Sequence, residues 1–461
     1  MPQLDFRSAL PVPAAEAFRW HERPGALQRL TPPWADEHLV SFEGIRNGQR
    51  AVLRLRRSGV RVRWVAEHQG YVADEKFEDV QVKGPFRRWH HVHRFEPSGP
   101  DAGVMHDAIT FEAPLGGLGE GTLVRELTQR FAYRHRVLRD DLAAHARYDG
   151  PPLRVAISGA SGLIGTALTH LLTTGGHTVL SLTRSEKAPP EAIRWDPRTG
   201  EIEADKLEGV DAVVHLAGEP IAALRWSDDK KAQILSSRER GTELLARTLA
   251  RLTQRPRVFV SASGVGYYGD RGHEVLTEDA PAGPLGFLPA VCMLWEKATA
   301  PAADAGIRTV QMRTGVVLTP AGGALQAMLP AFRAGLGGRI GSGRQYMSWI
   351  SIDDTLGGYL HALTTEALQG PVNLSGPAPV PMAEFAQTLV SVLNRPAFFP
   401  VPAALLTAVT GSMGRELLLA SARVVPERLQ ATGYAFRHAD LETALRHVLG
   451  RARAGAPFPE V

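Results

Sequence analysis

A short glycine-rich turn between a predicted strand and a predicted helix constrains this chain more than any other feature. Residues 159–165 read Gly-Ala-Ser-Gly-Leu-Ile-Gly and directly follow the apolar segment 154–158. A tight strand-to-helix turn needs glycine where φ is positive and where the backbone approaches a diphosphate. The N–H groups that begin the helix then bind the phosphates, assisted by the helix dipole. The turn therefore predicts nucleotide binding rather than a purely structural role. The residues expected to contribute are Gly159, Ser161, Gly162, Leu163, Ile164 and Gly165.

The chain around this turn alternates between short apolar strands and longer amphipathic helices. Such alternation predicts an α/β fold with a doubly wound parallel sheet of the Rossmann type. The predicted strands are 154–158, 178–183, 212–216, 257–261 and 309–313. The predicted helices include 163–173, 230–252 and 291–300, and a smaller, mainly helical region follows after about residue 380.

The second predicted strand of this region is followed by Arg184, nineteen residues beyond Gly165. Sites that prefer NAD usually have an acidic residue here, which accepts a hydrogen bond from the ribose hydroxyl. An arginine instead suits the 2′-phosphate of NADP(H) through charge-assisted contacts. We therefore expect NADP(H) as the cofactor; the alternative is an ordinary surface arginine in an arginine-rich chain.

Residues 148–152, Tyr-Asp-Gly-Pro-Pro, predict a joint between domains because two prolines after a glycine cannot continue a helix. The region before the joint is predicted to be α+β, with antiparallel strands at 51–57, 60–65, 87–95 and 109–112 and a helix at 136–147. The predicted domains are 1–149, 153–380 and 395–450.

Composition limits the classes of partner. The chain has 461 residues, of which 44% are hydrophobic and 22% charged, an ordinary globular composition. Its net charge of +4 is spread evenly along the chain, which argues against a nucleic-acid surface. No apolar stretch is long enough to span a bilayer. The single cysteine, Cys292, is compatible with a reducing compartment, so we expect a cytoplasmic protein that acts on a small molecule.

Several segments resemble the extended short-chain dehydrogenase/reductase superfamily, and more closely its epimerase-like subfamily of nucleotide-sugar epimerases. They are the turn at 159–165, His-Leu-Ala-Gly at 215–218, Ser-Ala-Ser-Gly-Val-Gly-Tyr-Tyr-Gly at 261–269, Trp-Asp-Pro at 195–197, Ser-Arg at 237–238, Trp-Glu at 295–296, Arg-Thr-Gly-Val-Val-Leu at 313–318, Gly-Ser-Gly-Arg-Gln at 341–345 and Trp-Ile-Ser-Ile-Asp-Asp at 349–354. The tail at 395–449 is similar to the small C-terminal domain of that subfamily.

The amino-terminal region resembles the helix-grip (START/Bet v 1-like, or SRPBCC) superfamily. The matching segments are 22–25, 29–34 and 83–89. The resemblance implies a curved antiparallel sheet around a long C-terminal helix, with a cavity for an apolar ligand.

The superfamily resemblance implies a catalytic Tyr-x-x-x-Lys pair, and this chain has none. None of its seven lysines has a tyrosine four positions before it. Aligning Glu296 with the family's glutamate puts Leu288 and Cys292 at the tyrosine and lysine positions. The resemblance assigns the family's serine to Ser263, and Tyr267 and Tyr268 remain as sources of a phenolic proton.

Further site residues are expected at the ends of the later strands. The resemblance implies cofactor contacts from Leu216, Ala217, Gly218, Arg238 and Ser261. Substrate contacts are expected from Glu219 and from Arg344 and Gln345, whose loop suits an anionic or sugar-like molecule; a simple surface turn is the alternative for that loop.

His91 and His93 share a strand face in the amino-terminal region. The sequence offers no third ligand near them, so we expect structural histidines and no metal site.

Two functions are compatible with these features. The first is an NADP(H)-dependent oxidoreductase or epimerase acting on a carbonyl or sugar-like substrate. The second is a non-catalytic, NADP(H)-binding regulatory protein, since some relatives in the subfamily carry cell-division annotations. A third interpretation, in which the first domain is a cyclase or dehydratase, is opposed by its lack of an evident acid–base pair. The oligomeric state is left open.

Overall fold

The computed structural model describes residues 2–57, 59–114, 119–148, 150–222, 225–284, 286–396 and 399–451. The chain divides into two compact units, which are described separately. The first unit comprises 1–151, 170–176 and 447–461, and the second comprises 152–169 and 177–446. Asp149, at the predicted end of the first domain, lies outside the described residues.

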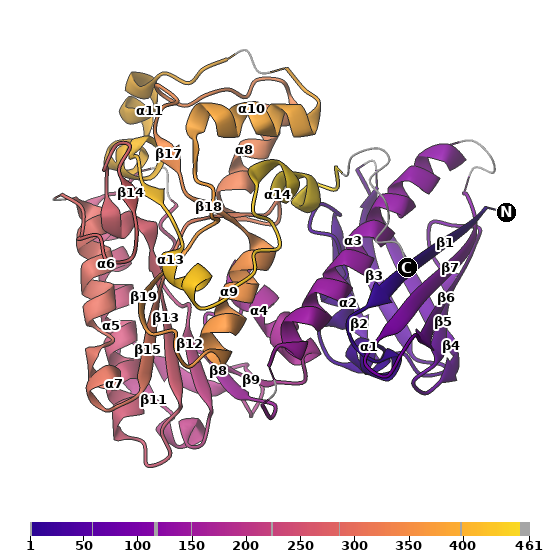
Figure 1. The fold of residues 1–461 in the computed structure, drawn as a ribbon. Coiled ribbons are helices and arrows are strands. Elements are labelled where there is room, and N and C mark those ends of the chain that lie inside the picture. Colours follow the sequence, from indigo (N-terminus) through magenta and orange to yellow (C-terminus); the bar gives the residue numbers. More distant parts are fainter. Residues whose placement is uncertain are drawn as a thin grey trace. The chain divides into compact units, whose positions relative to one another are not determined.

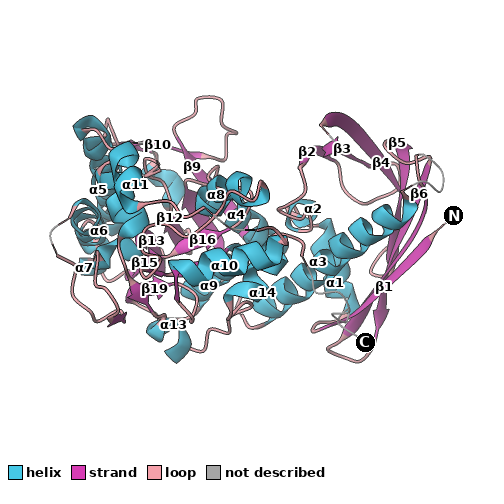
Figure 2. Cartoon of the chain, turned by 90° about the horizontal axis from the view of Figure 1, so that it is seen from above, coloured by secondary structure: helices cyan, strands magenta, loops and turns pink. Residues whose placement is uncertain are grey.

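The first unit contains a seven-stranded antiparallel sheet in the order β1-β7-β6-β5-β4-β3-β2 (Figure 1). Its strands are β1 (Gln3–Leu10), β2 (Glu37–Phe42), β3 (Arg50–Arg57), β4 (Val60–Val72), β5 (Lys76–Lys83), β6 (Arg88–Pro97) and β7 (Gly103–Glu112). Its helices are α1 (Ala14–Glu22), α2 (Ala26–Arg29) and α3 (Glu120–Ala146). A strongly curved antiparallel sheet with one long helix is the predicted helix-grip fold, which is confirmed (Figure 2).

Helix α3 is longer than the sequence predicted. The prediction began at residue 136, whereas the helix begins at Glu120. Leu123, Leu127 and Phe131 recur at four-residue spacing and are buried, so the earlier turns also have an apolar face. Phe131 stacks on Phe6 of β1 with ring centroids 5.0 Å apart, which ties the helix to the sheet.

The second unit is built on an eight-stranded sheet in the order β11-β10-β9-β8-β12-β13-β15-β19. All of its strand pairs are parallel except β10 with β11. The strands are β8 (Arg154–Ser158), β9 (Thr178–Thr183), β10 (Ile193–Asp196), β11 (Glu201–Ile202), β12 (Ala212–His215), β13 (Val258–Gly264), β15 (Arg308–Thr314) and β19 (Gly370–Leu374). This order reverses between β8 and β12, as in the predicted Rossmann architecture, which is confirmed.

Helices lie on both faces of this sheet. They are α4 (Leu163–Thr174), α5 (Asp228–Arg251), α6 (Phe287–Lys297), α7 (Ala300–Asp304), α8 (Gly323–Arg333) and α9 (Ile352–Thr364). In Figure 1, α5, α6 and α7 stand together on one side of the sheet. Leu245 and Leu249 of α5 share a buried core with Val213 and Phe259 of the sheet, and this burial fixes the helix in place.

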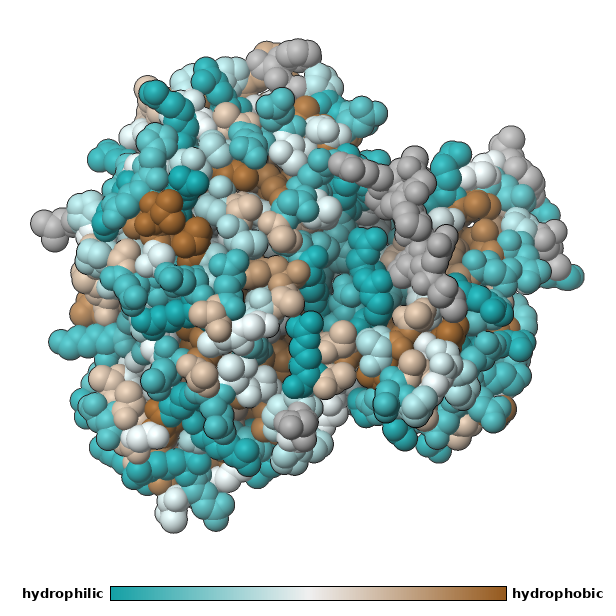
Figure 3. Space-filling view, in the orientation of Figure 1, coloured by the Kyte–Doolittle hydropathy of each residue, from teal (hydrophilic) through white to brown (hydrophobic). Residues whose placement is uncertain are grey.

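Short helices follow the last strand of the large sheet: α10 (Met382–Leu393), α11 (Ala403–Thr410), α12 (Ser412–Gly414), α13 (Glu427–Ala431) and α14 (Leu441–Val448). The second unit also contains three two-stranded sheets: β14 (Val275–Leu276) with β21 (Arg423–Val424), β16 (Val316–Leu318) with β18 (Trp349–Ser351), and β17 (Tyr346–Met347) with β20 (Val380–Pro381). The first and the third join residues that follow β19 to earlier parts of the chain. The face in Figure 3 is mainly hydrophilic, with small separate hydrophobic patches. Among the described residues, no helix combines the length and hydropathy needed to cross a membrane.

Candidate functional site

The glycine turn connects β8 directly to α4, as predicted. Gly159 adopts a φ of +72°, and a Cβ added there would lie 2.8 Å from the backbone nitrogen of Ala217. A Cβ at Gly165 would overlap the carbonyl oxygen of Gly159. Glycine is thus required at both ends of the turn. The backbone of residues 216–217, which follow β12, passes close to Gly159, and the backbone of Gly159 itself passes close to Gly165.

The N-terminus of α4 is open to solvent. Ser161, Gly162 and Leu163 are exposed, Ile164 is half-buried, and Gly165 is buried. The first N–H groups of a helix have no partner within that helix, and the helix dipole makes this end positive. The combination of an exposed helix start and side-chain-free backbone fits a diphosphate at this turn.

Ser158 and His215 fasten β8 to β12 beneath the turn. Both side chains are completely buried, and Ser158 Oγ lies 2.6 Å from His215 Nδ1. The backbone N–H groups of Leu216 and Ala217 donate to Ser158 Oγ at 3.2 and 3.3 Å, so the hydroxyl proton is directed to Nδ1. Burial lowers the pKa of His215 to about 3, which keeps the ring neutral. The Ser158–His215 hydrogen bond, here called the clasp, and the two backbone hydrogen bonds to Ser158 set the position of residues 216–218 beside Gly159.

Arg238 of α5 lies under the strand continuation at Gly218. Its Nη1 donates to the carbonyl oxygens of Glu219 and Ile234 at 2.9 and 3.1 Å, and its guanidinium lies 4.8 Å above the ring of Trp295. Burial lowers the pKa of Arg238 to about 10. The Glu219 carboxylate accepts from Lys230. Arg238 therefore fixes the backbone that follows β12 through its hydrogen bond to the carbonyl oxygen of Glu219. The Glu219 carboxylate is already paired with the ammonium group of Lys230.

The end of β9 carries excess positive charge. Arg184 is exposed there, and the nearby Asp196 accepts from Arg198 at 2.7 Å. Hydrogen bonds from Arg198, with a smaller contribution from the charge of Arg184, lower the pKa of Asp196 to about 2. Because Asp196 is already paired with Arg198, this edge presents a cation where an NAD-preferring site would present an acid.

Ser263, at the end of β13, belongs to a buried polar network. Its hydroxyl donates to Glu296 Oε1 of α6 at 2.7 Å. Arg313 of β15 binds the same carboxylate through two hydrogen bonds, both 2.8 Å long. Arg313 is 3% exposed, and although burial opposes its charge, the contacts with Glu296 raise its pKa. With its proton directed to Glu296, Ser263 offers its oxygen as an acceptor.

The two adjacent tyrosines have different surroundings. Tyr268 is fully buried, and its hydroxyl donates toward Asn373 Oδ1 at 2.7 Å and accepts from Arg313 at 2.9 Å. Tyr267 is half-buried, and the Arg313 guanidinium lies 3.5 Å from its ring centroid. The geometry favours a structural role for Tyr268 and leaves Tyr267 as the more accessible phenol.

Helix α6 places Leu288 and Cys292, one turn apart, against the segment that contains Ser263. The Cys292 thiol lies 3.6 Å from the carbonyl oxygen of Gly264, and a Cβ on Gly266 would lie 3.1 Å from Leu288. Burial raises the pKa of Cys292 to about 12, so the thiol is neutral and unreactive. Neither residue can supply the proton transfer of a tyrosine–lysine pair.

Three further predicted site residues are Ser261, Arg344 and Gln345. Ser261 is buried within β13, paired with His215 of β12, and contributes backbone rather than a free side chain. Arg344 is exposed, whereas Gln345 is buried and donates to the carbonyl oxygens of Ile340 and Leu418. Gln345 thus holds its own loop in place, which leaves Arg344 as the better candidate for a substrate contact.

Two side-chain pairings at this site were not predicted from the sequence. Ser158–His215 and Glu296–Arg313 each join residues from different elements, although His215, Glu296 and Arg313 lie in the quoted segments. The available signal was that a charged or imidazole side chain ends an otherwise apolar strand.

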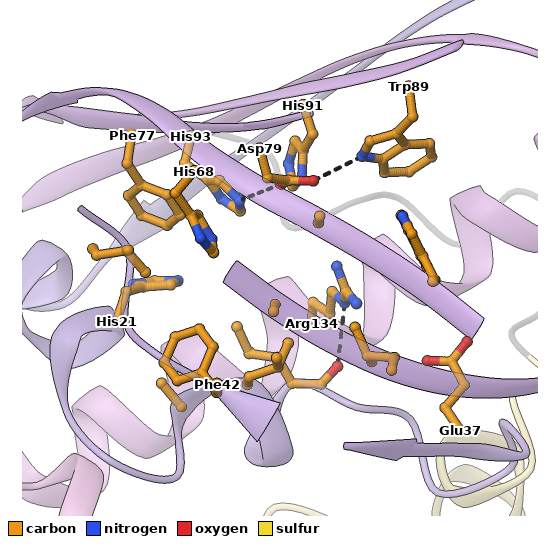
Figure 4. A pocket seen from close by; sticks show the side chains of 18 residues that line it. His21, Glu37, Phe42, His68, Phe77, Asp79, Trp89, His91, His93 and Arg134 are labelled. Atoms are coloured by element: carbon orange, nitrogen blue, oxygen red, sulfur yellow. Dashed lines mark hydrogen bonds and ion pairs between the residues drawn. The ribbon is translucent and has the colours of Figure 1, made fainter. Parts of the chain in front are cut away.

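A cavity lies within the first unit, between its sheet and helices. Its volume is about 750 Å³, counting its open mouth. Much of the lining is apolar or aromatic, including Phe42, Ile45, Leu53, Phe77 and Trp89. Asp79, His91 and His93 also line it, and Figure 4 shows them close together. The expectation that no third ligand lies near the two histidines is therefore wrong, because β5 places Asp79 beside them.

Three family descriptions match successive parts of the chain. Residues 10–144 match "Polyketide cyclase / dehydrase and lipid transport". Residues 155–374 match "NAD dependent epimerase/dehydratase family". Residues 401–448 match "Domain of unknown function (DUF1731)".

Known proteins resemble either about two thirds of this chain or nearly all of it. An epimerase family protein of Mycobacterium bovis is 44% identical over 297 residues, which are 64% of this chain and 98% of the relative. The crystal structure of a nucleoside-diphosphate sugar epimerase from Corynebacterium glutamicum is 35% identical, covers 98% of this chain and 91% of that one, and has a TM-score of 0.81. The crystal structure of human epimerase family protein SDR39U1 (isoform 2) with NADPH is 39% identical, covers 65% of this chain and 100% of that one, and has a TM-score of 0.60. These similarities and the geometry of the turn show that the chain belongs to the NAD-dependent epimerase/dehydratase family, here with an amino-terminal polyketide cyclase-like domain and a carboxy-terminal DUF1731 domain.

Proposed function

We propose that the second unit binds NADP(H) at the turn between β8 and α4 and exchanges hydride with a carbonyl or alcohol group of a bulky, sugar-like small molecule. The observation that carries the proposal is the geometry of the glycine turn at residues 159–165. Gly159 and Gly165 allow the exposed start of α4 to lie close to the ends of β8 and β12. The nicotinamide would supply the redox chemistry. The human relative whose structure contains NADPH supports this choice of cofactor.

Arg184→Ala is expected to weaken NADPH binding about tenfold to a hundredfold, because it removes a charge-assisted contact with the 2′-phosphate. NADH, which has no such phosphate, should bind unchanged. Calorimetry with both dinucleotides measures the effect. Arg257→Ala is the matched control, since Arg257 is also exposed but precedes β13, at the opposite end of the strands. Equal NADPH affinity in wild type and Arg184→Ala would contradict the assignment.

On the substrate side, we propose that Ser263 accepts a hydrogen bond from the reacting hydroxyl and that Tyr267 transfers the proton. Ser263 is suited to accept because its own proton goes to Glu296. The Arg313 guanidinium lies 3.5 Å from the centroid of the Tyr267 ring and holds the ring in place beside Ser263. Arg344 would contact an anionic group of the substrate.

Tyr267→Phe is expected to reduce turnover by about 10²–10⁴-fold, because it removes the proton donor while the ring remains. NADPH affinity should not change. The measurement follows nicotinamide oxidation with a panel of carbonyl compounds. Tyr268→Phe is the comparison variant: it loses hydrogen bonds to Asn373 and Arg313, so it should lower stability and retain turnover. Full activity in Tyr267→Phe would exclude this role.

A second candidate is a non-catalytic protein that binds NADP(H) as a regulatory ligand. The presence of Leu288 and Cys292 where α6 faces Ser263 favours it, since neither side chain can move a proton at neutral pH. Tight NADPH binding combined with no oxidation across the panel would select this candidate.

For the first unit, we propose that the cavity takes a small apolar molecule. Its aromatic lining and the match to a polyketide cyclase and lipid transport description support this ligand class. We also propose a cytoplasmic location, based on the single, buried cysteine.

A further inference from the structure

The cavity of the first unit contains a compact group of buried acidic and imidazole side chains that the proposed nucleotide chemistry does not use. Strand register produces it: Asp79 of β5 lies opposite His91 of β6, and His93 of β6 lies opposite Asp107 of β7. Because alternate residues of a strand share a face, His91 and His93 both point inward. They are 2% and 8% exposed, so the group is almost completely removed from water.

Three of these side chains converge on one point. Asp79 Oδ2 lies 3.0 Å from His91 Nδ1 and 3.6 Å from His93 Nε2. The three ligand atoms all lie within 4.8 Å of one another. Trp89 Nε1 donates to Asp79 Oδ1 at 2.8 Å and turns the other carboxylate oxygen toward the histidines (Figure 4). Metal–ligand bonds of about 2.0–2.1 Å separate neighbouring ligand atoms by about 3.0–3.4 Å, so the spacing accommodates a small cation.

The opposite ring nitrogens of both histidines face a second carboxylate. Asp107 Oδ1 lies 3.2 Å from His91 Nε2 and 2.8 Å from His93 Nδ1. Asp107 Oδ2 is held by His135 Nε2 at 2.9 Å, and His135 Nδ1 is in turn 2.7 Å from Ser8 Oγ. Metal-binding histidines generally direct their second nitrogen to such a carboxylate, which fixes the tautomer and the ring orientation. Asp107 lies within reach of the second nitrogen of both rings, although these two contacts do not have hydrogen-bond geometry in the structure.

His21 is an independent sign of a ligand in the same cavity. Its Nδ1 lies 2.8 Å from the carbonyl oxygen of Ala17, and since a carbonyl can only accept, Nδ1 carries the proton. Nε2 therefore has a free lone pair. This atom is buried and has no hydrogen-bond partner among the described residues, and the His21 ring centroid lies 6.0 Å from that of His93. A buried acceptor without a donor is costly unless something else occupies the cavity.

We propose that Asp79, His91 and His93 bind a divalent first-row transition metal ion, whose remaining coordination positions face the cavity. Two imidazoles and one carboxylate suit zinc or ferrous iron rather than magnesium or calcium, which prefer oxygen ligands. The open positions would take water or an oxygen of an otherwise apolar molecule, so the first unit is a metal-assisted binding site. This inference does not depend on the nucleotide site.

Cobalt(II) is the probe, because its visible ligand-field absorption reports imidazole and carboxylate coordination. The full chain, stripped of metal with a chelator and dialysed, is titrated with CoCl₂. We expect a saturable visible spectrum at one equivalent per chain, and a rise in the thermal unfolding midpoint with added ZnCl₂ because the ion binds the folded state. A folded wild-type protein that develops no spectrum overturns the proposal.

Single substitutions assign the ligands. His91→Gln and His93→Gln should each abolish the cobalt spectrum, and Asp107→Asn should weaken cobalt binding about 10–100-fold through the lost support. His90→Gln is the matched control: His90 directly precedes His91 on β6, pairs with Glu78 at 2.8 Å, and has a 44% exposed side chain. It should bind cobalt like wild type. An unchanged spectrum in both His91→Gln and His93→Gln would overturn the assignment, and the wild-type titration decides the question if either variant fails to fold.

Discussion

Replacing Glu296 with alanine is expected to lower the free energy of unfolding by about 3–5 kcal/mol, because it leaves the Arg313 guanidinium buried without its counter-ion. Two hydrogen bonds of 2.8 Å join these side chains, and Arg313 is 3% exposed. The remaining partners of Arg313 are the hydroxyl of Tyr268 and the carbonyl oxygen of Glu278, which carry no charge. Urea unfolding, followed by circular dichroism, measures the change.

An exposed pair of the same type provides the control. Glu243 and Arg247 of α5 also form two hydrogen bonds, but their side chains are 42% and 58% exposed. Glu243→Ala should therefore cost less than about 1 kcal/mol. The double variant Glu296→Leu with Arg313→Leu removes both charges and should cost less than Glu296→Ala alone. Similar costs for Glu296→Ala and Glu243→Ala would show that burial of the pair does not matter.

The second unit was the more predictable part of the fold. Strands β8 and β9 have the predicted bounds, and β12, β13 and β15 differ from prediction by one to three residues at their ends. Parallel strands are buried on both faces, so they read as continuous apolar runs that are easily separated from amphipathic helices. The glycine turn was predictable for the same reason, since its residues and both neighbouring elements are local in sequence.

The first unit was less predictable. Strands β1, β2 and β5 were not predicted, because charged side chains are frequent in all three, β2 has no buried residue, and only Phe77 is buried in β5. The start of α3 was missed because polar residues such as Arg125, Glu126 and Gln129 lower the average hydropathy of turns that still have an apolar face. Short alternating segments carry a weak signal, and only their packing on one another resolves it.

The polar contacts of the candidate sites were not predictable from the sequence. The sequence does not indicate that Asp79 is a neighbour of His91, because this contact depends on the register with which β5 pairs with β6. Gln345 looked available to a substrate, whereas it donates to the carbonyl oxygen of Ile340 and to that of Leu418, which lies in the helical segment Arg415–Leu419. Sequence spacing identifies residue types suited to a chemistry, but the partner of each group depends on strand order and register.

Acidification is expected to destabilise the folded chain through His215. Burial lowers the pKa of this ring from 6.5 to about 3, so between these pH values the unfolded chain binds a proton that the folded chain does not accept. The contribution is fully present above pH 6.5 and is lost as the pH falls toward 3. At 1.36 kcal/mol per pH unit, it amounts to about 2 kcal/mol between pH 6.5 and pH 5. Since His215 fastens β12 to β8, the loss weakens the base of the glycine turn.

His215→Asn separates this contribution from those of other buried histidines, because an asparagine oxygen can accept the Ser158 proton without titrating near neutral pH. The decrease in unfolding free energy between pH 7 and pH 5, measured with urea, should be about 2 kcal/mol smaller in His215→Asn than in wild type. His273→Asn, at an exposed position of the same unit, should reproduce the wild-type decrease. The ring can also be observed directly: its nitrogen NMR shifts should show a neutral imidazole at pH 5. Titration of His215 near its ordinary pKa would mean that the clasp between β8 and β12 opens to water at neutral pH.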